Sequence, residues 1–122
     1  MTDAPSVAPS TIPSSGDFVE RMPGVRWAVV PLVGATAVYW DFEPGATVPR
    51  HNHVHAQLVV GLEGEIDLIF DDKTVTVHGG EILPIGPWQW HAANVGKPCR
   101  CVDVFIPNRE EYEAEYAAKR NA

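Results

Sequence analysis

The sequence predicts an all-β domain, a barrel or sandwich of short strands followed by a single helix. From Val25 onward, short runs rich in Val, Ile, Trp and Tyr are interrupted by Gly or Pro every eight to twelve residues. This rhythm is typical of antiparallel β domains and differs from the alternation of strands and long helices in α/β proteins. Only the segment from Arg109 to Arg120 combines strong helix formers with early acidic and late basic residues.

Each expected strand is a short run of β-branched, aromatic or alternating apolar residues. The strands are Val25 to Val30, Ala35 to Phe42, His51 to Val60, Glu65 to Phe70, Thr74 to His78, Glu81 to Ile85, His91 to Asn94 and Cys99 to Ile106. The polar triplet 71–73 is expected to form the tip of a hairpin. Glycines in 61–64 and 79–80 provide the positive φ angles that tight turns need.

The chain length of 122 residues fits one domain with a single core. Residues 1–16 contain three prolines, four serines and few residues that could enter a core, so a disordered or extended arm is expected there. We assign residues 17–108 to the barrel and residues 109–122 to the C-terminal helix and tail.

Charge and composition narrow the possible partners. The formal net charge is −7 and the chain has no run of Lys or Arg, which argues against nucleic acid and anionic membrane surfaces as partners. No apolar stretch approaches the roughly 18 residues of a membrane span, and the N-terminus does not resemble a signal peptide. Cys99 and Cys101 are expected to be reduced thiols. These features favour a cytoplasmic protein that binds a small molecule.

A metal site is predicted by four residues, which are His51, His53, Gln57 and His91. Side chains on a strand alternate faces, so the even offsets between the first three direct them to one side, and His91 is expected from a second strand. Imidazoles and an amide oxygen suit one divalent transition metal, with Zn, Ni, Mn, Fe and Co all acceptable. Because the glutamine is neutral, the ion would keep its full charge, which favours Lewis-acid chemistry over oxidation.

Two segments resemble the sequence motifs of the cupin superfamily. Gly45 to Gly64 is similar to the pattern G-x5-H-x-H-x3-E-x6-G, except that Gln57 replaces the glutamate. Gly80 to His91 is similar to the second motif, although Gly86 takes the place of its proline and Trp88 the place of its second glycine. The resemblance covers residues 25–108 and implies a cupin jelly-roll barrel of two antiparallel sheets, with a homodimer as the common assembly.

The C-terminal run from Asp103 to Tyr112 extends the resemblance to small cupins with a glutamine ligand, among them enzymes that ketonise 4,5-unsaturated uronates in pectin and alginate breakdown. Such a tail also occurs in cupins of unknown activity. The resemblance implies an isomerase or lyase acting on a small acidic substrate. Asp103 would then transfer a proton and Arg109 would hold the substrate carboxylate. Expected substrate contacts are Phe105, Gln89, Trp90 and His55. His55 is alternatively a fifth ligand or a proton shuttle, or has only an orienting or solvent-facing role.

Other functions remain open from the sequence. Small cupins include dioxygenases and polyketide cyclases, and oxygen consumption would separate the first of these from a proton-transfer enzyme. A non-catalytic cupin that binds a ligand through its metal would show tight binding without turnover. A structural cupin without metal is the last alternative, and elemental analysis would identify it.

Overall fold

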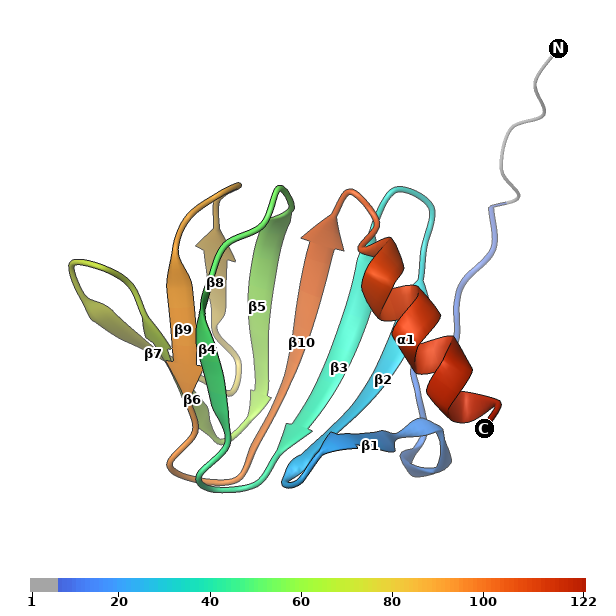
Figure 1. The fold of residues 1–122 in the computed structure, drawn as a ribbon, viewed down its shortest axis with the longest axis horizontal. Coiled ribbons are helices and arrows are strands. Elements are labelled where there is room, and N and C mark those ends of the chain that lie inside the picture. Colours follow the sequence, from blue (N-terminus) through green and yellow to red (C-terminus); the bar gives the residue numbers. More distant parts are fainter. Residues whose placement is uncertain (1–6) are drawn as a thin grey trace, which may run out of the picture.

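The computed structural model describes residues 7–122, which form two antiparallel sheets and a C-terminal helix (Figure 1). The strands are β1 (Val19–Met22), β2 (Val25–Pro31), β3 (Thr36–Phe42), β4 (Thr47–His51), β5 (Ala56–Glu63), β6 (Glu65–Ile69), β7 (Thr74–His78), β8 (Ile82–Ile85), β9 (His91–Asn94) and β10 (Cys99–Ile106). The 3-10 turn η1 (Ser15–Asp17) precedes them and α1 (Glu110–Arg120) follows. The predicted all-β class with a short C-terminal helix is confirmed. Residues 1–6 of the expected N-terminal arm lie outside the described residues, and residues 7–14 form neither helix nor strand.

The two sheets enclose the core. The larger sheet has the order β1-β2-β3-β10-β5-β8 and the smaller one the order β4-β9-β6-β7. Trp27, Val38, Val59 and Ile85 of the larger sheet are almost completely buried, and Ile66 and Leu68 cover them from the smaller sheet. Strand β10 pairs with both β3 and β5 and is therefore central in the larger sheet. Its residues alternate as expected, with Cys101, Asp103 and Phe105 facing the interior.

The predicted strand from His51 to Val60 is wrong, because the chain changes sheets in the middle of it. Strand β4 ends at His51 in the smaller sheet, and β5 begins at Ala56 in the larger one. Residues 52–55 form the bend between them. The even spacing of His51, His53 and Gln57 therefore does not place them on one strand face. The crossing between the sheets brings them to the same side of the barrel.

A short strand that the sequence did not predict, β1, forms the edge of the larger sheet. It pairs with β2 through an irregular register, and its residues alternate between half-buried and exposed positions. The segment contains two charged residues among four and is directly followed by a proline and a glycine, so its composition gave no strand signal. It brings Arg21 to the wall of the barrel interior.

Helix α1 packs against β2 and closes one side of the barrel (Figure 1). Tyr112 and Tyr116 contact the buried ring of Trp27 edge-on, with centroid distances of 5.2 and 6.3 Å. The hydroxyl of Tyr116 also donates a hydrogen bond to the carbonyl of Asp17 at 2.6 Å. These contacts fix the position of the helix and direct Tyr112 toward the interior. Within the described residues, no helix has the length and apolar character that crossing a membrane requires.

The outer face of the larger sheet carries exposed apolar side chains. Leu58 and Leu62 of β5, Ile82 of β8 and Ile106 of β10 are between 37% and 64% exposed. A surface of this kind is compatible with association of subunits. The homodimer implied by the cupin resemblance stays a prediction.

Candidate metal centre

Three histidines from separate segments converge inside the barrel. His51 ends β4, His91 begins β9 directly opposite it, and His53 lies in the bend that leads to β5. One ring nitrogen from each histidine lies within 4.8 Å of the others. The rings of His51 and His91 are 4.3 Å apart between centroids, and His53 lies 5.1 Å from His91. This is a separation that one bound ion can bridge.

Backbone carbonyls set the orientation of all three rings. The Nδ1 atom of His51 donates to the carbonyl of Pro49 at 2.8 Å. The Nδ1 atom of His53 donates to the carbonyl of His55 at 3.0 Å, and that of His91 to the carbonyl of Gln89 at 2.8 Å. A carbonyl oxygen can only accept, so each Nδ1 carries the hydrogen and each Nε2 keeps a free lone pair. Metal-binding histidines are commonly oriented in this way.

The arrangement of the Nε2 atoms fits a cation. The Nε2 atom of His53 lies 3.0 Å from Oε1 of Gln57, and with Nδ1 protonated both atoms are acceptors. The buried Nε2 atom of His91 has no hydrogen-bond partner among the described residues. A cation between these lone pairs would satisfy all of them. The donor set of three imidazole nitrogens and one amide oxygen is suitable for a divalent transition metal.

The protonation of the buried histidines agrees with this interpretation. Burial, with the positive charge of Arg109 as a second cause, lowers the pKa of His53 to about 4. Burial also lowers the pKa of His91. Both rings are therefore neutral at pH 7, which is the form that binds a metal.

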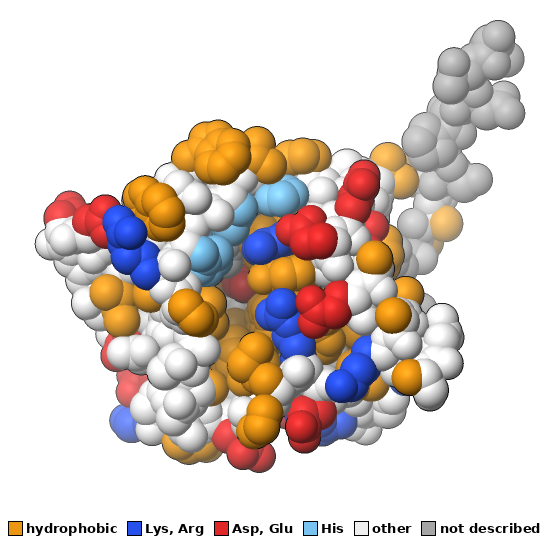
Figure 2. All heavy atoms as spheres, viewed as in Figure 1, with side chains coloured by type: hydrophobic (Ala, Val, Ile, Leu, Met, Phe, Trp, Pro, Cys, Tyr) orange, Lys and Arg blue, Asp and Glu red, His pale blue; other side chains and the backbone are white. Residues whose placement is uncertain are grey.

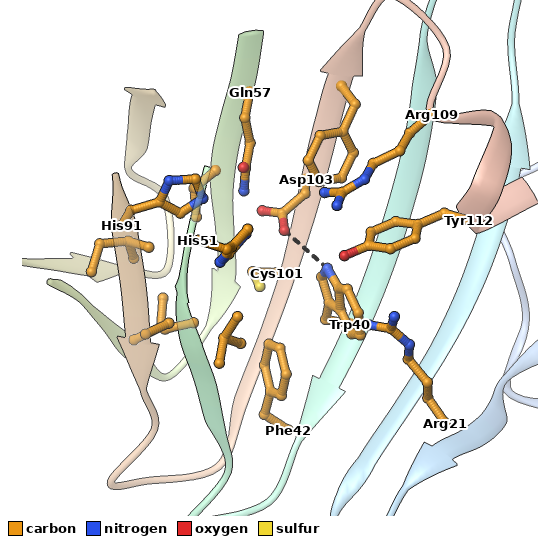
Figure 3. A pocket seen from close by; sticks show the side chains of 16 residues that line it. Arg21, Trp40, Phe42, His51, Gln57, His91, Cys101, Asp103, Arg109 and Tyr112 are labelled. Atoms are coloured by element: carbon orange, nitrogen blue, oxygen red, sulfur yellow. Dashed lines mark hydrogen bonds between the residues drawn. The ribbon is translucent and has the colours of Figure 1, made fainter. Parts of the chain in front are cut away.

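A cavity of about 60 Å³ lies beside the histidines and is lined by both sheets and α1 (Figure 3). Its inner walls are apolar, with Phe42, Val59, Leu68 and Phe105 among them. Polar side chains enter from the side of the histidine cluster and from the opposite wall. Figure 2 shows the opening as a hollow with histidines on one side and Lys and Arg side chains on the other.

Asp103 lies in this cavity between the candidate ligands and the aromatic wall (Figure 3). Its Oδ2 atom accepts a hydrogen bond from Nε1 of Trp40 at 2.9 Å. Burial raises the pKa of the Asp103 carboxyl to about 7, while hydrogen bonds from Gln57 and Trp40 and the charge of Arg109 act against that rise. Gln57, the predicted fourth ligand, lines the same cavity beside Asp103 (Figure 3). A carboxyl in this position can either accept or release a proton near neutral pH.

Arg109 enters the cavity from the segment between β10 and α1. Its guanidinium lies over the ring of Tyr112 at 3.7 Å and over Phe105 at 4.8 Å. The Nε atom donates to Glu111 at 2.7 Å, and the backbone N–H donates to the hydroxyl of Thr36 at 2.8 Å. The side chain is almost completely buried. These contacts hold a positive charge beside Asp103, where an anionic substrate group could bind.

The sequence matches the cupin domain family over residues 38–105, which include all four predicted ligands. The chain belongs to the cupin family. Its fold is similar to that of KdgF from Halomonas sp., with 22% identity, a TM-score of 0.73 and coverage of 79% of this chain and 92% of KdgF.

Other solved cupins share the same fold. An RmlC-like cupin from Shewanella frigidimarina is 21% identical, with a TM-score of 0.75 and coverage of 85% of this chain and 96% of that protein. Ectoine synthase from P. lautus is 18% identical, with a TM-score of 0.68 and coverage of 81% and 76% respectively. None of the curated proteins compared with the chain matches it significantly in sequence. The structural likeness therefore establishes the fold, and the chemistry has to be argued from the site.

Three residues predicted to contact substrate in this cupin lie outside the cavity lining. His55 is buried against Phe105, and its Nε2 lies 3.3 Å from the carbonyl of Asn108, so it is not part of the three-histidine cluster. Gln89 turns its side chain back to accept from the N–H of Gly86 at 3.0 Å. Trp90 is exposed and packs under the guanidinium of Arg50 at 4.2 Å. The fourth, Phe105, does line the cavity, as expected.

The cavity also contains residues that the sequence did not single out as site residues. Arg21 of β1, Trp40 of β3 and Tyr112 of α1 form the wall opposite the histidines (Figure 3). Trp40 belongs to an ordinary strand pattern. Tyr112 ends the C-terminal run that resembles other small cupins, but no role is predicted for it from that run. Arg21 forms an ion pair with Glu115, which is 94 residues away in the chain. These residues become recognisable only when α1 is placed against the barrel.

Trp88 stands at the second glycine of the C-terminal cupin motif and adopts a positive φ of 63°. Its N–H donates to the carbonyl of His53 at 2.7 Å, and its own carbonyl accepts from the side chain of Asn52 at 3.1 Å. The turn is therefore attached to the bend that carries a predicted ligand. A left-handed backbone favours glycine, and a bulky residue is strained there.

We expect Trp88→Gly to be more stable than Trp88→Ala by about 1 kcal/mol. Both substitutions remove the indole, which is 60% exposed, but only glycine adopts the positive φ without steric conflict. Urea denaturation of the two variants provides the measurement. An alanine variant as stable as the glycine variant would show that the turn does not hold this conformation in solution.

Proposed function

We propose that this cupin is a metal-dependent enzyme that transfers a proton on a small acidic substrate, in a reaction of the isomerase or lyase type. The observation that carries the proposal is the position of Asp103, whose carboxyl lies in the cavity between the predicted ligand Gln57 and the guanidinium of Arg109. A proton-transferring group, a cation for substrate binding and a candidate metal site thus share one small cavity.

The residues of this cavity and the adjoining His53 have distinct chemical tasks in the proposed reaction. His51, His53, His91 and Gln57 would hold the metal, which as a Lewis acid polarises a substrate oxygen when bound. Arg109 binds the substrate carboxylate through its Nη hydrogens. Asp103 exchanges a proton with a substrate carbon, and its raised pKa allows both the charged and the neutral form near pH 7. Phe105 and the apolar inner walls exclude water from the reacting atoms.

The local charge of the site supports an anionic substrate despite the net charge of −7. Arg109 and Arg21 both line the cavity, and the predicted metal ligands are all neutral. Asp103 is the one carboxylate among the residues that line it. With a divalent ion bound, the cavity carries net positive charge and attracts an acid locally.

A 4,5-unsaturated uronate is the substrate that we propose to test first. Its ketonisation needs a proton delivered to carbon, a polarised oxygen and a carboxylate anchor, which correspond to Asp103, the metal and Arg109. It is also the reaction of the glutamine-ligand cupins that the C-terminal run resembles.

The experiment is turnover of the unsaturated uronate by the full chain loaded separately with Zn, Ni, Mn, Fe or Co. We expect Arg109→Ala to raise KM by about tenfold or more, because a charged hydrogen bond contributes roughly 1.5–3 kcal/mol. Arg109→Lys should restore part of the affinity. Unchanged kinetics in Arg109→Ala would contradict the anchor role, and tight ligand binding without turnover would identify a non-catalytic cupin instead.

A further inference from the structure

A second hollow, with a volume of about 250 Å³, adjoins the site cavity and shares part of its wall. The two spaces have Trp40, Phe42, Val48, His51, Tyr112 and Arg21 in common. The second hollow continues past these residues toward Met22, Val25 and Pro49. Its lining is apolar except for His51, Thr47, Tyr112 and Arg21, and Arg21 is its one Lys, Arg, Asp or Glu residue. Arg21 is therefore the one charged side chain of this lining that an anionic group entering the hollow could pair with.

The guanidinium of Arg21 is held rigidly at the junction of the two spaces. It lies 4.4 Å from the ring centroid of Trp27 and 4.7 Å from that of Tyr112. Its Nε and Nη2 atoms donate to the two carboxylate oxygens of Glu115 at 2.9 and 3.2 Å. Stacking and a two-point ion pair remove most of the rotational freedom of this side chain.

Arg109 is held in the same way on the other side of Tyr112. Its Nε atom also donates to a glutamate of α1, Glu111, and its guanidinium also stacks on the Tyr112 ring. Glu111 and Glu115 are four residues apart and so lie on one face of the helix. Figure 3 shows Arg109, Tyr112 and Arg21 as a column along the wall that faces Asp103 and His51. We call this set the arginine column.

Both ends of the arginine column keep free donors. Glu115 takes the Nε and Nη2 hydrogens of Arg21 and Glu111 takes the Nε hydrogen of Arg109, so neither glutamate takes the Nη1 hydrogens of Arg21 or the Nη hydrogens of Arg109. Neither glutamate lines the cavity, whereas both arginines do, and their guanidinium groups turn toward it (Figure 3). Free guanidinium hydrogens beside an apolar surface are suited to carboxylate oxygens, because such pairs form charge-assisted hydrogen bonds.

We propose that Arg21 is a second anion-binding residue of the site, so that the preferred substrate is an unsaturated uronate or related small acid that carries a second anionic group, with one group on Arg109 and the other on Arg21. The inference rests on the proposed function, because it assigns one end of the substrate to Arg109. Tyr112 separates the two guanidinium carbons, which lie 3.7 and 4.7 Å from its ring centroid on either side. Glutarate, whose two carboxylates are separated by three methylene groups, is the short diacid that we choose as a probe of this pair.

The competing explanation is that Arg21 only attaches β1 to α1 through Glu115. Arg21→Gln and Glu115→Gln break the same ion pair, so a purely structural role predicts the same effect from both. A binding role predicts that only Arg21→Gln changes ligand affinity. The pair therefore serves as a matched control within this chain.

The test measures binding of glutarate and valerate to the zinc-loaded full chain by isothermal titration calorimetry. The two probes have equal chain length, and only glutarate has a second carboxylate. We expect the wild-type protein to bind glutarate at least tenfold more tightly than valerate. Arg21→Gln should reduce the preference to less than twofold, while Glu115→Gln should keep at least a fivefold preference. Should Arg21→Gln fail to fold, Arg21→Lys is expected to lower the preference by at least threefold.

Two results would overturn the inference. One is equal affinity of the wild-type protein for both probes, and the other is an equal loss of preference in Arg21→Gln and Glu115→Gln. Failure of the proposed function has a different signature, since it would leave the preference for glutarate intact while no acid is turned over. Direct chelation of zinc by glutarate would give a preference that survives in Arg21→Gln, and this outcome also counts against the inference.

Discussion

Replacing Asp103 by asparagine is expected to lower kcat for the unsaturated uronate by about 10²- to 10⁴-fold, the usual contribution of a general acid or base. Asparagine has nearly the same shape, and its side-chain oxygen can still accept the hydrogen bond from Trp40. It cannot take up or release a proton in the relevant range. The reaction should therefore lose its proton-transfer step while the cavity keeps its form.

Stability provides a second readout for the same variant. Burial raises the pKa of the Asp103 carboxyl, which means that the fold disfavours its charged form. A neutral side chain of equal size should consequently leave the melting temperature unchanged or slightly higher. Loss of activity together with retained stability would separate a catalytic role from a structural one.

Asp41→Asn is the matched control, because Asp41 is an aspartate on the neighbouring strand β3 whose carboxylate lies 3.8 Å from Arg100, outside the cavity lining. We expect its kcat to stay within twofold of the wild-type value. An Asp103→Asn variant that keeps more than a tenth of the wild-type kcat would contradict the proposed role of Asp103. Steady-state kinetics on the metal-loaded protein measures both variants.

The barrel was predictable because most of its strands have a local sequence pattern that is typical of β structure. Strand β10 alternates inward and outward residues, and the hairpin between β6 and β7 has a polar tip at 71–73. Strand β1 was not predictable, since its register depends on β2 and its Arg21 is positioned by Glu115 of α1. Contacts between distant segments leave no trace in local composition.

Three of the four candidate ligands, the histidines, form a cluster as predicted, but the reason given for it was wrong. The histidine spacing suggested one strand, whereas the chain leaves the smaller sheet after His51 and enters the larger one at Ala56. The histidines still converge, because the same residue spacing fits a chain that crosses between the two sheets. Gln89 and Trp90 lie outside the cavity lining because the prediction for them assumed an extended backbone, where the positive φ of Trp88 makes a turn.

Loading the protein with zinc is expected to raise its melting temperature by about 10 °C. A ligand that binds only the folded state stabilises it by RT ln(1 + [L]/Kd), which is about 4 kcal/mol when the free ligand is a thousand times Kd. For a chain of this size each kcal/mol corresponds to roughly 3 °C. Differential scanning calorimetry with and without a chelator measures the shift, and elemental analysis gives the metal content.

The effect of zinc should disappear in His91→Ala and persist in His78→Ala. His91 points an unpaired Nε2 atom at the cluster, so its loss removes a ligand in the zinc form but breaks no hydrogen bond of Nε2 in the metal-free form. The substitution should therefore cost much more stability with zinc than without it. The side chain of His78 is 57% exposed and pairs with Glu65 and Glu81 at the surface, and it is not part of the histidine cluster. An equal zinc-dependent shift in wild type and His91→Ala would contradict the predicted site, because zinc would then stabilise the fold without the ligand that β9 supplies opposite His51.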